Sequence, residues 1–593
     1  MTTRSNIGLL AKVLAALLAF SLIAAACGDD SGGDDGATST DGTSGDDGGD
    51  DGSDDGSDDG TTDGTDGTDT PECDENQVCE DGGDDGGDDG SADPDPVYGG
   101  TVTIALEAET NSGWLPATEQ CAISCHWIQR AIMEPLFLED ADGNAAPFLA
   151  SGFEFNDDFT EVDIFLREGI SFTNGEAFDA DAVVANFVRS KAGTILGQVL
   201  VDMISAEKVD EYTVKLTFQK PQSQIIEGLT GQLGYMGAPA MMAADADPTV
   251  MIGTGPFMQV EWNPDVEFVA ERNPNYWRSD EAGNQLPFLD GIVFRPIPDK
   301  DARLNAVQSG DVDINMSSFS EDQEFWLANY RTVPETKFRE TTYLLINNAQ
   351  APMDDERVRR ALALCMDRSV YQQLRAPASE IANGPFAPGV AGYLADTGFP
   401  EFDPEAGRAL LAEIGDIPTI EYGTTPVPAN VITADLITGM WSDNCGIDTE
   451  VVTIEQGNFI TQALLGNFQV FLWRNHGAIS PGSEDVWWHS DHGGPTGALA
   501  IANFGRIDNP DIDAALDATN ATRDPAELTS IAEDINREFA ENVHNIWLNW
   551  TEWTQIMNDN VYGLGSTTLP DGGRSMSVIA GRVSFDEVFI AQG

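Results

Sequence analysis

The sequence has little positive charge. Its 593 residues include 29 lysines and arginines against 101 aspartates and glutamates, and only five histidines. Proteins that bind nucleic acid neutralise its phosphates with Lys and Arg, so this composition excludes nucleic acid as the main partner. Strong acidity is compatible with life in salty water, where ions screen the repulsion between like charges.

Common catalytic motifs are also absent. The chain has no Gly-x-Ser-x-Gly elbow, no His-Glu-x-x-His motif and no P-loop. Carboxylate pairs are frequent, but none lies in a frame that marks a glycosidase. The sequence therefore predicts a protein that is not an enzyme, and a secreted hydrolase is the alternative from another functional class.

A long hydrophobic run is missing at the amino terminus. Val13–Ala26 is apolar and follows the positive residues Arg4 and Lys12. This run is shorter than the ~20 residues that a membrane-spanning helix needs. Residues 1–26 are therefore predicted to be a secretory signal peptide, with an anchor helix as the alternative.

Apolar residues are nearly absent from the next segment, 27–96. Between Gly28 and Pro96 there are 27 acidic residues and no Lys or Arg. Such a segment cannot bury enough surface to offset its conformational entropy, which predicts a disordered acidic Gly/Asp tether. Calcium binding by the DDGGDDGG runs is the alternative, but these runs lack a fixed frame of ligands. The rest of the chain keeps 74 acidic against 27 basic residues outside the signal.

Six of the seven cysteines form an even set after Cys27, which directly follows the signal. The set consists of Cys73 and Cys79, Cys121 and Cys125, and Cys365 and Cys445. An even number in an exported protein favours disulfide bonds. Metal ligation by Cys121, Cys125 and His126 is the alternative, but structural zinc needs a fourth ligand and usually C-x₂₋₄-C pairs.

Residues 253–277 carry the densest turn and strand signals. They read GTGPFMQVEWNPDVEFVAERNPNYW. A glycine-rich joint leads into two predicted strands, Phe257–Val260 and Glu267–Ala270, with Asn263–Asp265 as the turn. Such a hairpin fits many α/β proteins. The order of GTGPF, a strand pair and RNPNYW resembles the oligopeptide- and dipeptide-binding family of ABC-importer substrate-binding proteins, solute-binding family 5.

This resemblance runs from about Gly99 to Leu564 and implies the fold class. The implied fold is α/β, two-lobed and periplasmic-binding-protein-like (class II), with an extra side domain. The implied divisions are a first lobe from 97–143, 253–340 and 555–593, a side domain from 144–252, and a second lobe from 341–554. The lobes are expected to close on a ligand by hinge motion.

The first predicted strand leads toward the expected cleft. Thr101–Leu106 alternates apolar and polar residues as a half-buried strand does. Ligands of α/β sheets lie beyond the carboxyl ends of strands, so the exit Glu107–Trp114 should face the cleft. Trp114 is a candidate ligand contact, with a place in the core as the equal alternative.

The second stretch expected at the cleft is 468–492, FQVFLWRNHGAISPGSEDVWWHSDH. Phe468–Trp473 is predicted to be a strand with a loop after it. In peptide-binding relatives, a Trp here is followed three residues on by an Asp that pairs with the peptide's α-amino group, whereas this chain has His476. A histidine does not replace a permanent carboxylate. Arg474 and His476 therefore suggest a ligand with an acidic or hydrogen-bond-accepting group.

Three tryptophans of this stretch, Trp473, Trp487 and Trp488, could stack on a sugar or aromatic ring. One of the adjacent pair is expected in the core and the other at the cleft. The predicted ligand contacts are thus Trp114, Trp473, Arg474, His476 and Trp487.

A metal site is the alternative for the three histidines of the same stretch. Some relatives carry nickel chelates, and His489 and His492 could bring two imidazoles together beside His476. Loop histidines beside Asp491 are more often hydrogen-bonded, so neither a metal nor another cofactor is predicted.

The resemblance also implies localisation and partners. Leu22–Gly28 resembles a lipobox, although Ala24 stands where Leu is commoner. Cleavage before Cys27 and lipidation of its sulfur would anchor a monomeric protein on the outer face of the cell membrane. The expected function is to capture a peptide or other small solute and deliver it to an ABC permease and its ATPase. Sensor-coupled binding and nickel-chelate binding are the alternatives.

Overall fold

The computed structural model describes residues 93–591, except 110–112, 120, 194–195, 319, 336, 338, 476–479, 498–499 and 501. The chain divides into two units, Met1–Asp88 and Asp89–Gly593, and the described residues belong to the second. The predicted signal peptide, Cys27, nearly all of the tether and the Cys73/Cys79 pair lie outside the described residues.

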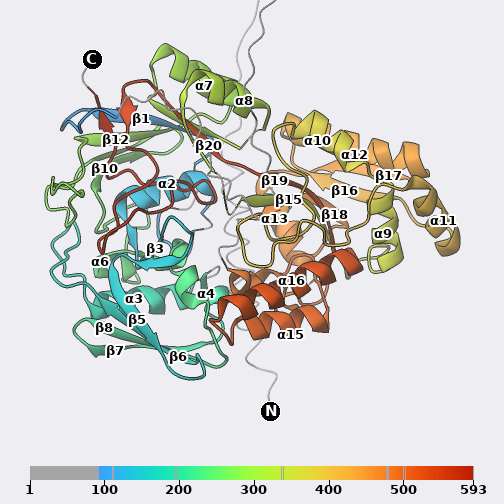
Figure 1. Cartoon of the computed structure of the whole chain (residues 1–593), viewed down its shortest axis with the longest axis horizontal. Coiled ribbons are helices and arrows are strands. Elements are labelled where there is room, and N and C mark those ends of the chain that lie inside the picture. Colours follow the sequence, from blue (N-terminus) through green and yellow to red (C-terminus); the bar gives the residue numbers. More distant parts are fainter. Residues whose placement is uncertain are drawn as a thin grey trace, which may run out of the picture. The chain divides into compact units, whose positions relative to one another are not determined.

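The first of two large sheets has seven strands in the order β10-β11-β12-β1-β13-β20-β14 (Figure 1). β1 runs parallel to β12 and β13, whereas the neighbours farther out are antiparallel. The strands are β1 (Thr101–Leu106), β10 (Phe257–Asn263), β11 (Glu267–Arg272), β12 (Gly291–Pro296), β13 (Ile314–Ser317), β14 (Arg331–Pro334) and β20 (Thr554–Met557).

Helices cover both faces of this sheet, as the alternation in β1 requires. Val102, Ile104 and Leu106 share one core with α2 (Ile123–Ile132). Ala105 points to the other face and packs in a smaller core with residues of α7 (Lys300–Ser309) and α8 (Ser320–Asn329). Because successive side chains of a strand point to opposite faces, the odd-numbered residues of β1 face α7 and the even-numbered residues face α2.

The predicted glycine joint packs directly on the end of α2. Gly255 N–H donates to the Ile132 carbonyl at 3.0 Å, and a Cβ on Gly253 would lie 2.0 Å from the same oxygen. The aromatic end of the RNPNYW motif is fixed nearby, because Tyr276 Oη and Trp277 Nε1 donate to Glu134 at 2.7 and 2.8 Å. Burial raises the pKa of Glu134 to about 7. Close backbone packing thus accounts for the glycines of this stretch, and hydrogen bonds to Glu134 account for its Tyr-Trp end.

A separate four-stranded sheet, in the order β5-β6-β8-β7, lies between β1 and the central hairpin in sequence. It packs against α3 (Ala180–Lys191), whose N-cap residue Asp179 accepts Ala182 N–H at 3.0 Å. The strands and short helices of this part are β5 (Ala150–Phe155), β6 (Glu161–Leu166), β7 (Met203–Asp210), β8 (Thr213–Phe218), α4 (Leu196–Val199), α5 (Ile225–Gly228), η1 (Gln232–Gly234) and α6 (Pro239–Met242).

The second large sheet has five strands in the order β17-β16-β18-β15-β19. β16 runs parallel to β17 and β18, and β15 is antiparallel to both β18 and β19. The strands are β15 (Glu340–Ile346), β16 (Ile420–Thr424), β17 (Thr449–Thr453), β18 (Val470–Asn475) and β19 (Asn545–Thr551).

Helices of the second sheet form one core with its strands. They are α9 (Glu356–Leu364), α10 (Arg368–Arg375), α11 (Pro404–Ile414), α12 (Pro428–Cys445), α13 (Gln456–Leu465), α14 (Asp485–Trp488), α15 (Pro510–Thr519) and α16 (Pro525–Asn542), while the short helices η2 (Pro481–Glu484) and η3 (Ser490–His492) lie before and after α14. Short strand pairs complete the chain: β2 (Glu134–Pro135) with β9 (Tyr235–Met236), β3 (Phe137–Glu139) with β4 (Ala145–Pro147), and β21 (Val561–Tyr562) with β22 (Phe589–Ile590).

The chain crosses between the two large sheets at two adjacent places. It leaves the first sheet after β14 and enters β15, and it returns from β19 into β20. Glu335 N–H donates to the Trp553 carbonyl at 2.9 Å, so the two crossings lie side by side. Two helix-covered sheets joined in this way form the two-lobed α/β fold that was predicted.

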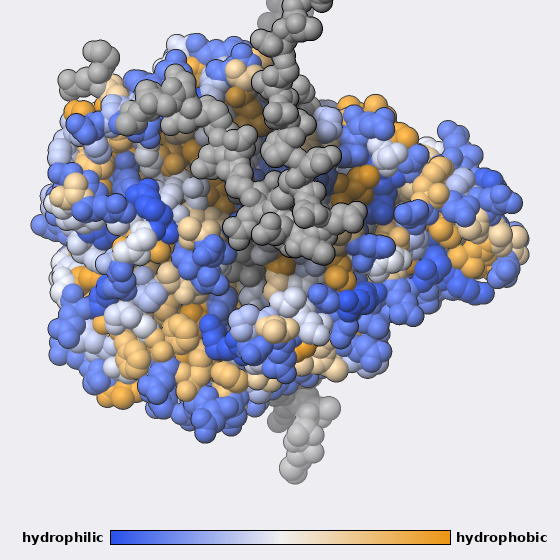
Figure 2. All heavy atoms as spheres, viewed as in Figure 1, coloured by the Kyte–Doolittle hydropathy of each residue, from blue (hydrophilic) through white to orange (hydrophobic). Residues whose placement is uncertain are grey.

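Two predicted disulfides are present. Cys121 is bonded to Cys125, and Cys365 to Cys445. The alternative of metal ligation by the first pair is therefore wrong, since both sulfurs are bonded to each other and His126 Nδ1 lies 3.2 Å from Tyr235 Oη. Hydrophilic residues cover much of the visible face in Figure 2. Within the described part, no helix has the length and apolar character needed to cross a membrane.

Replacing Gly253 tests the close approach at the central joint. We expect Gly253→Ala to destabilise the fold by about 1–3 kcal/mol, because its methyl group would overlap the Ile132 carbonyl. Chemical denaturation measures the change. Gly439→Ala is the matched control: nothing lies within 4 Å of its Cβ position, and alanine favours the helix by about 1 kcal/mol. Equal stability of the two variants would contradict the packing argument.

Candidate ligand-binding site

The carboxyl ends of the parallel strands meet at one edge of the first sheet. Glu107 follows β1, Ile297 follows β12 and Ser318 follows β13. In the second sheet, the end of β18 lies beside the start of β15, with Arg474 opposite Thr342. Strand ends of this kind are where α/β folds bind ligands.

Arg474 joins these two edges. Its Nη1 donates to Ser318 Oγ at 2.8 Å, and its Nε lies 3.0 Å from Glu340 Oε2. The guanidinium also sits 5.0 Å from the ring centroid of Trp553, in the return crossing. Its side chain keeps 37% of its surface exposed. The predicted residue therefore lies between the lobes, with part of its surface open to a solute.

The predicted tryptophans Trp473 and Trp487 meet on the second lobe through Phe504. Phe504 makes edge contacts with Trp473 at 5.5 Å and with Trp487 at 5.7 Å between ring centroids. Trp488 is buried and packs on Phe539 at 4.9 Å, while Trp487 is half-buried. One tryptophan of the pair thus lies in the core, as expected, and the other is partly buried, while its place at the cleft stays a prediction.

Arg474 and Trp473 do not share a face of the sheet. Adjacent residues of a strand point to opposite faces. Trp473 pairs with Tyr343 and joins the core of the second lobe, whereas Arg474 reaches toward the first lobe. The aromatic pair and the arginine are therefore separate features of the same strand end.

The prediction that Trp114 contacts ligand is corrected by its burial. Its side chain is 0% exposed and packs edge-on against Trp262 at 5.0 Å and Phe268 at 5.2 Å. Both strands of the central hairpin, β10 with Trp262 and β11 with Phe268, pack against the indole. Trp114 is therefore a core residue, which was the alternative to a ligand contact. The other predicted contact, His476, lies outside the described residues.

Two buried carboxyl groups at the crossings were missed in the sequence. Glu335 Oε2 accepts Trp553 N–H at 3.2 Å, and Glu340 Oε2 accepts Trp553 Nε1–H at 3.1 Å. Burial, together with the nearby Glu340, raises the pKa of Glu335 well above its usual value. Their only sequence signal was a pair of acidic residues just before the predicted boundary between the first and second lobes at 340/341.

The side sheet also contacts the second lobe. Ser223 N–H donates to the Asn520 carbonyl at 2.9 Å, and Ser223 Oγ donates to the Thr522 carbonyl at 2.6 Å. Arg523 pairs with Glu227 at 2.8 Å and donates to the Ser223 carbonyl. These contacts connect the segment after β8 to the turn between α15 and α16. We call them the 223–523 contacts.

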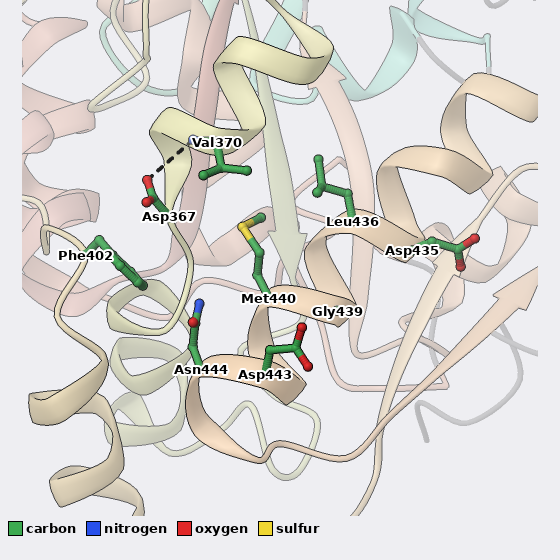
Figure 3. A pocket seen from close by; sticks show the side chains of 9 residues that line it. All are labelled: Asp367, Val370, Phe402, Asp435, Leu436, Gly439, Met440, Asp443 and Asn444. Atoms are coloured by element: carbon green, nitrogen blue, oxygen red, sulfur yellow. Dashed lines mark hydrogen bonds between the residues drawn. The ribbon is translucent and has the colours of Figure 1, made fainter.

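A groove of about 480 Å³ lies between α10 and α12 (Figure 3). Val370, Leu436 and Met440 form its apolar part, and Asp435 and Asp443 lie toward its rim. Every lining residue belongs to the second lobe, so closure of the two lobes would not enclose a ligand there. The strand-end site remains the better candidate.

Among the described residues, Asp485, His489 and Asp517 bring possible metal-ligand atoms within 4.8 Å of one another. His489 Nδ1 accepts Asp491 N–H at 3.2 Å, which leaves the ring proton on Nε2, the atom facing Asp517. A metal would have to displace this proton. A backbone hydrogen bond therefore orients the His489 ring, whereas its Nε2 lies 3.9 Å from Asp517 Oδ1, beyond hydrogen-bond distance.

Comparison with protein families identifies the chain. Residues 144–497 match the model of the middle region of the bacterial extracellular solute-binding proteins, family 5. This match covers more than half of the sequence. The chain belongs to this family.

Similar proteins bind diverse solutes. Heme-binding protein A of Haemophilus influenzae is 26% identical over 62% of this chain and 72% of its own length. The nickel-binding periplasmic protein of Escherichia coli K12 is 24% identical over 69% and 81%, respectively. A binding protein from A. tumefaciens R10, solved with agropinic acid, has a TM-score of 0.72 at 23% identity, covering 83% of this chain and 99% of that one.

Members of family 5 are extracytoplasmic substrate-binding proteins of ABC transporters, not enzymes. This role agrees with a site built from strand ends of two lobes rather than from a catalytic group. The structural likeness supports the fold alone, and the family match supports the role of solute binding.

Loss of Arg523 tests the 223–523 contacts. We expect Arg523→Ala to raise amide hydrogen exchange at Ser223 and neighbouring residues about tenfold, because Arg523 holds both Glu227 and the Ser223 carbonyl. Exchange measured by mass spectrometry resolves the segment. Arg537→Ala is the control, since Arg537 pairs only within α16 among the described residues. A uniform rise over the whole chain would argue against a local contact.

The buried Glu484, before α14, predicts a pH effect. It is 5% exposed, and burial raises its pKa to about 8. A raised pKa favours folding below the unfolded value of 4.5, and this contribution is lost as the pH rises through about 8. Glu484→Gln should therefore leave stability at pH 4 nearly unchanged and increase it at pH 9, by on the order of 1–3 kcal/mol. Denaturation at both pH values measures this, with exposed Glu413→Gln as the control.

Proposed function

We propose that this protein captures a small solute between its two lobes and delivers it to an ABC permease. The observation that carries the proposal is the position of Arg474. It belongs to the second sheet, yet it bonds Ser318 of the first and is partly exposed. A solute at this place can contact both lobes at once, which is what favours a closed state.

The proposed lobe divisions follow the membership of the two large sheets to within one residue, since Glu340 belongs to β15 and Thr554 to β20. The first lobe comprises 97–143, 253–340 and 555–593, the side domain 144–252 and the second lobe 341–554. The contacts of Arg474 and the 223–523 contacts support hinge closure between these parts. In the proposed mechanism the protein makes and breaks no covalent bond; it binds, closes and releases.

Membrane attachment is part of the proposal. The apolar run before Cys27 and the small residues around it support a lipoprotein that is held on the outer membrane face as a monomer. The partners are then a permease and its ATPase. Peptides remain candidate ligands, and the heme, nickel and agropinic acid named for similar proteins extend the range to chelates and acidic solutes.

The proposed ligand contacts are Trp473, Arg474, Trp487 and His476. Trp473 and Trp487 offer aromatic surface on one side of the end of β18, and Arg474 offers hydrogen-bond donors on the other, so a solute that contacts both extends around this strand end. Binding coupled to a sensor is the other role compatible with the same site. Neighbouring permease genes would favour the importer.

A ligand screen tests the function. Thermal unfolding is measured with peptides, sugars, acidic opines, heme and nickel chelates. A ligand at 100 times its Kd should add about 2.7 kcal/mol to the stability. Arg474→Gln should lower the affinity for the ligand found by at least tenfold and preserve the fold. Exposed Arg537→Gln is the control. Turnover of a ligand, or an unchanged affinity in the Arg474 variant, would contradict the proposal.

A further inference from the structure

Glu107 lies at the strand-end edge without having been predicted as a ligand contact. It directly follows β1, and Ile297 N–H donates to the Leu106 carbonyl at 2.8 Å, so the chain still runs beside the segment after β12 at this point. Side chains two positions apart on a strand point to the same face, so Glu107, like Ala105, is expected on the face of the sheet that α7 covers. The residue is half-buried.

Two arginines lie within electrostatic range of Glu107. Arg303 comes from α7 in the first lobe, and Arg474 comes from the second lobe. Burial raises the pKa of Glu107, the arginines lower it, and Glu340 raises it further; the net direction is upward. The surroundings therefore do not stabilise the charged carboxylate as well as water does.

The hydrogen bonds that these two arginines donate from Nη1 and Nε go to acceptors other than Glu107. Arg303 donates from Nη1 to the Ile297 carbonyl at 2.8 Å and from Nε to Asn315 Oδ1 at 3.2 Å. Arg474 is engaged by Ser318 and Glu340. Over the part of the chain that the structure describes, no group donates a hydrogen bond to the Glu107 carboxylate. Such an acceptor in a half-buried place needs a partner.

The best partner for this acceptor is a donor that also carries positive charge. A protonated amino group forms a charge-assisted hydrogen bond with a carboxylate, and this bond is stronger than one from a neutral donor. It would also compensate the desolvation that closure imposes. Peptide-binding relatives have an Asp three residues after the tryptophan that corresponds to Trp473. This chain has His476 there, so its second lobe lacks a carboxylate at that position.

We propose that Glu107, from the first lobe, receives the protonated amino group of the solute at the edge where Arg474 meets Ser318. This inference rests on the proposed solute-binding function and narrows its ligands to small amino compounds. The carboxylate that recognises the amine then belongs to the first lobe, whereas the family motif would place it in the second lobe. An amine bound to Glu107 beside Arg474 contacts both lobes and favours closure.

Matched pairs of probes test this inference. The purified full chain is titrated with di-alanine, tri-alanine and alanine, and with the N-acetyl form of each, by calorimetry and thermal unfolding. We expect at least one free amine to bind and its N-acetyl form to bind at least tenfold more weakly. Glu107→Gln should reduce the affinity for the free amine by about the same factor and abolish the discrimination. Glu261→Gln, which removes an exposed carboxylate from β10, should preserve it.

The outcomes separate this inference from the proposed function. Discrimination that persists in Glu107→Gln, or equal binding of the free and acetylated forms, would overturn the role of Glu107. Binding of only amine-free probes from the wider screen, such as heme or a nickel chelate, would keep the solute-binding function and overturn the amine. Failure of every probe to bind would count against both. Unchanged circular dichroism and unfolding of the ligand-free variant would exclude misfolding as the cause of lost affinity.

Discussion

Burial of carboxyl groups at the crossings between the lobes constrains the rest of the structure. Glu335 and Glu340 lie beside Trp553, where removal from water is costly unless donors replace it. Backbone and indole N–H groups supply some donors, and Arg474, from the same sheet as Glu340, supplies another. Opening the cleft would break the hydrogen bond from Arg474 to Ser318 at the end of β13, so water would have to replace Ser318. The crossing segments are thus coupled electrostatically to the ligand site.

Local signals in the sequence were sufficient for much of the fold. Asp403 accepts two backbone N–H groups at the start of α11, and Gly415 adopts a positive φ at its end, in the Asp-Pro and Gly pattern that is typical of helix termini. β1 has the predicted bounds, whereas the strands of the central hairpin extend beyond theirs. Steric and capping interactions within a few residues determine where these helices and strands begin and end, so the local sequence is enough to predict them.

Features that depend on distant segments were less predictable. An aromatic residue after a strand fits a cleft or a core equally well, and only the position of Trp262, in the hairpin, places Trp114 in the core. The guanidinium of Arg359, in α9, is buried and donates to the Val543 and Asn542 carbonyls, contacts that its own segment does not indicate. Ser223 and Thr522 meet across 299 positions, and no local pattern in either segment records that contact.

The arrangement of Arg474 changes what its charge implies about the ligand. From the sequence, an arginine at the end of β18 suggested an acidic solute. In the structure, Glu340 already neutralises this arginine at 3.0 Å, so an acidic solute would have to compete with a buried carboxylate whose loss of its partner is itself unfavourable. Glu107 has no such partner among the described residues. The unsatisfied group at this edge is therefore an acceptor, and electrostatics favours a solute that donates to it over one that brings a further negative charge.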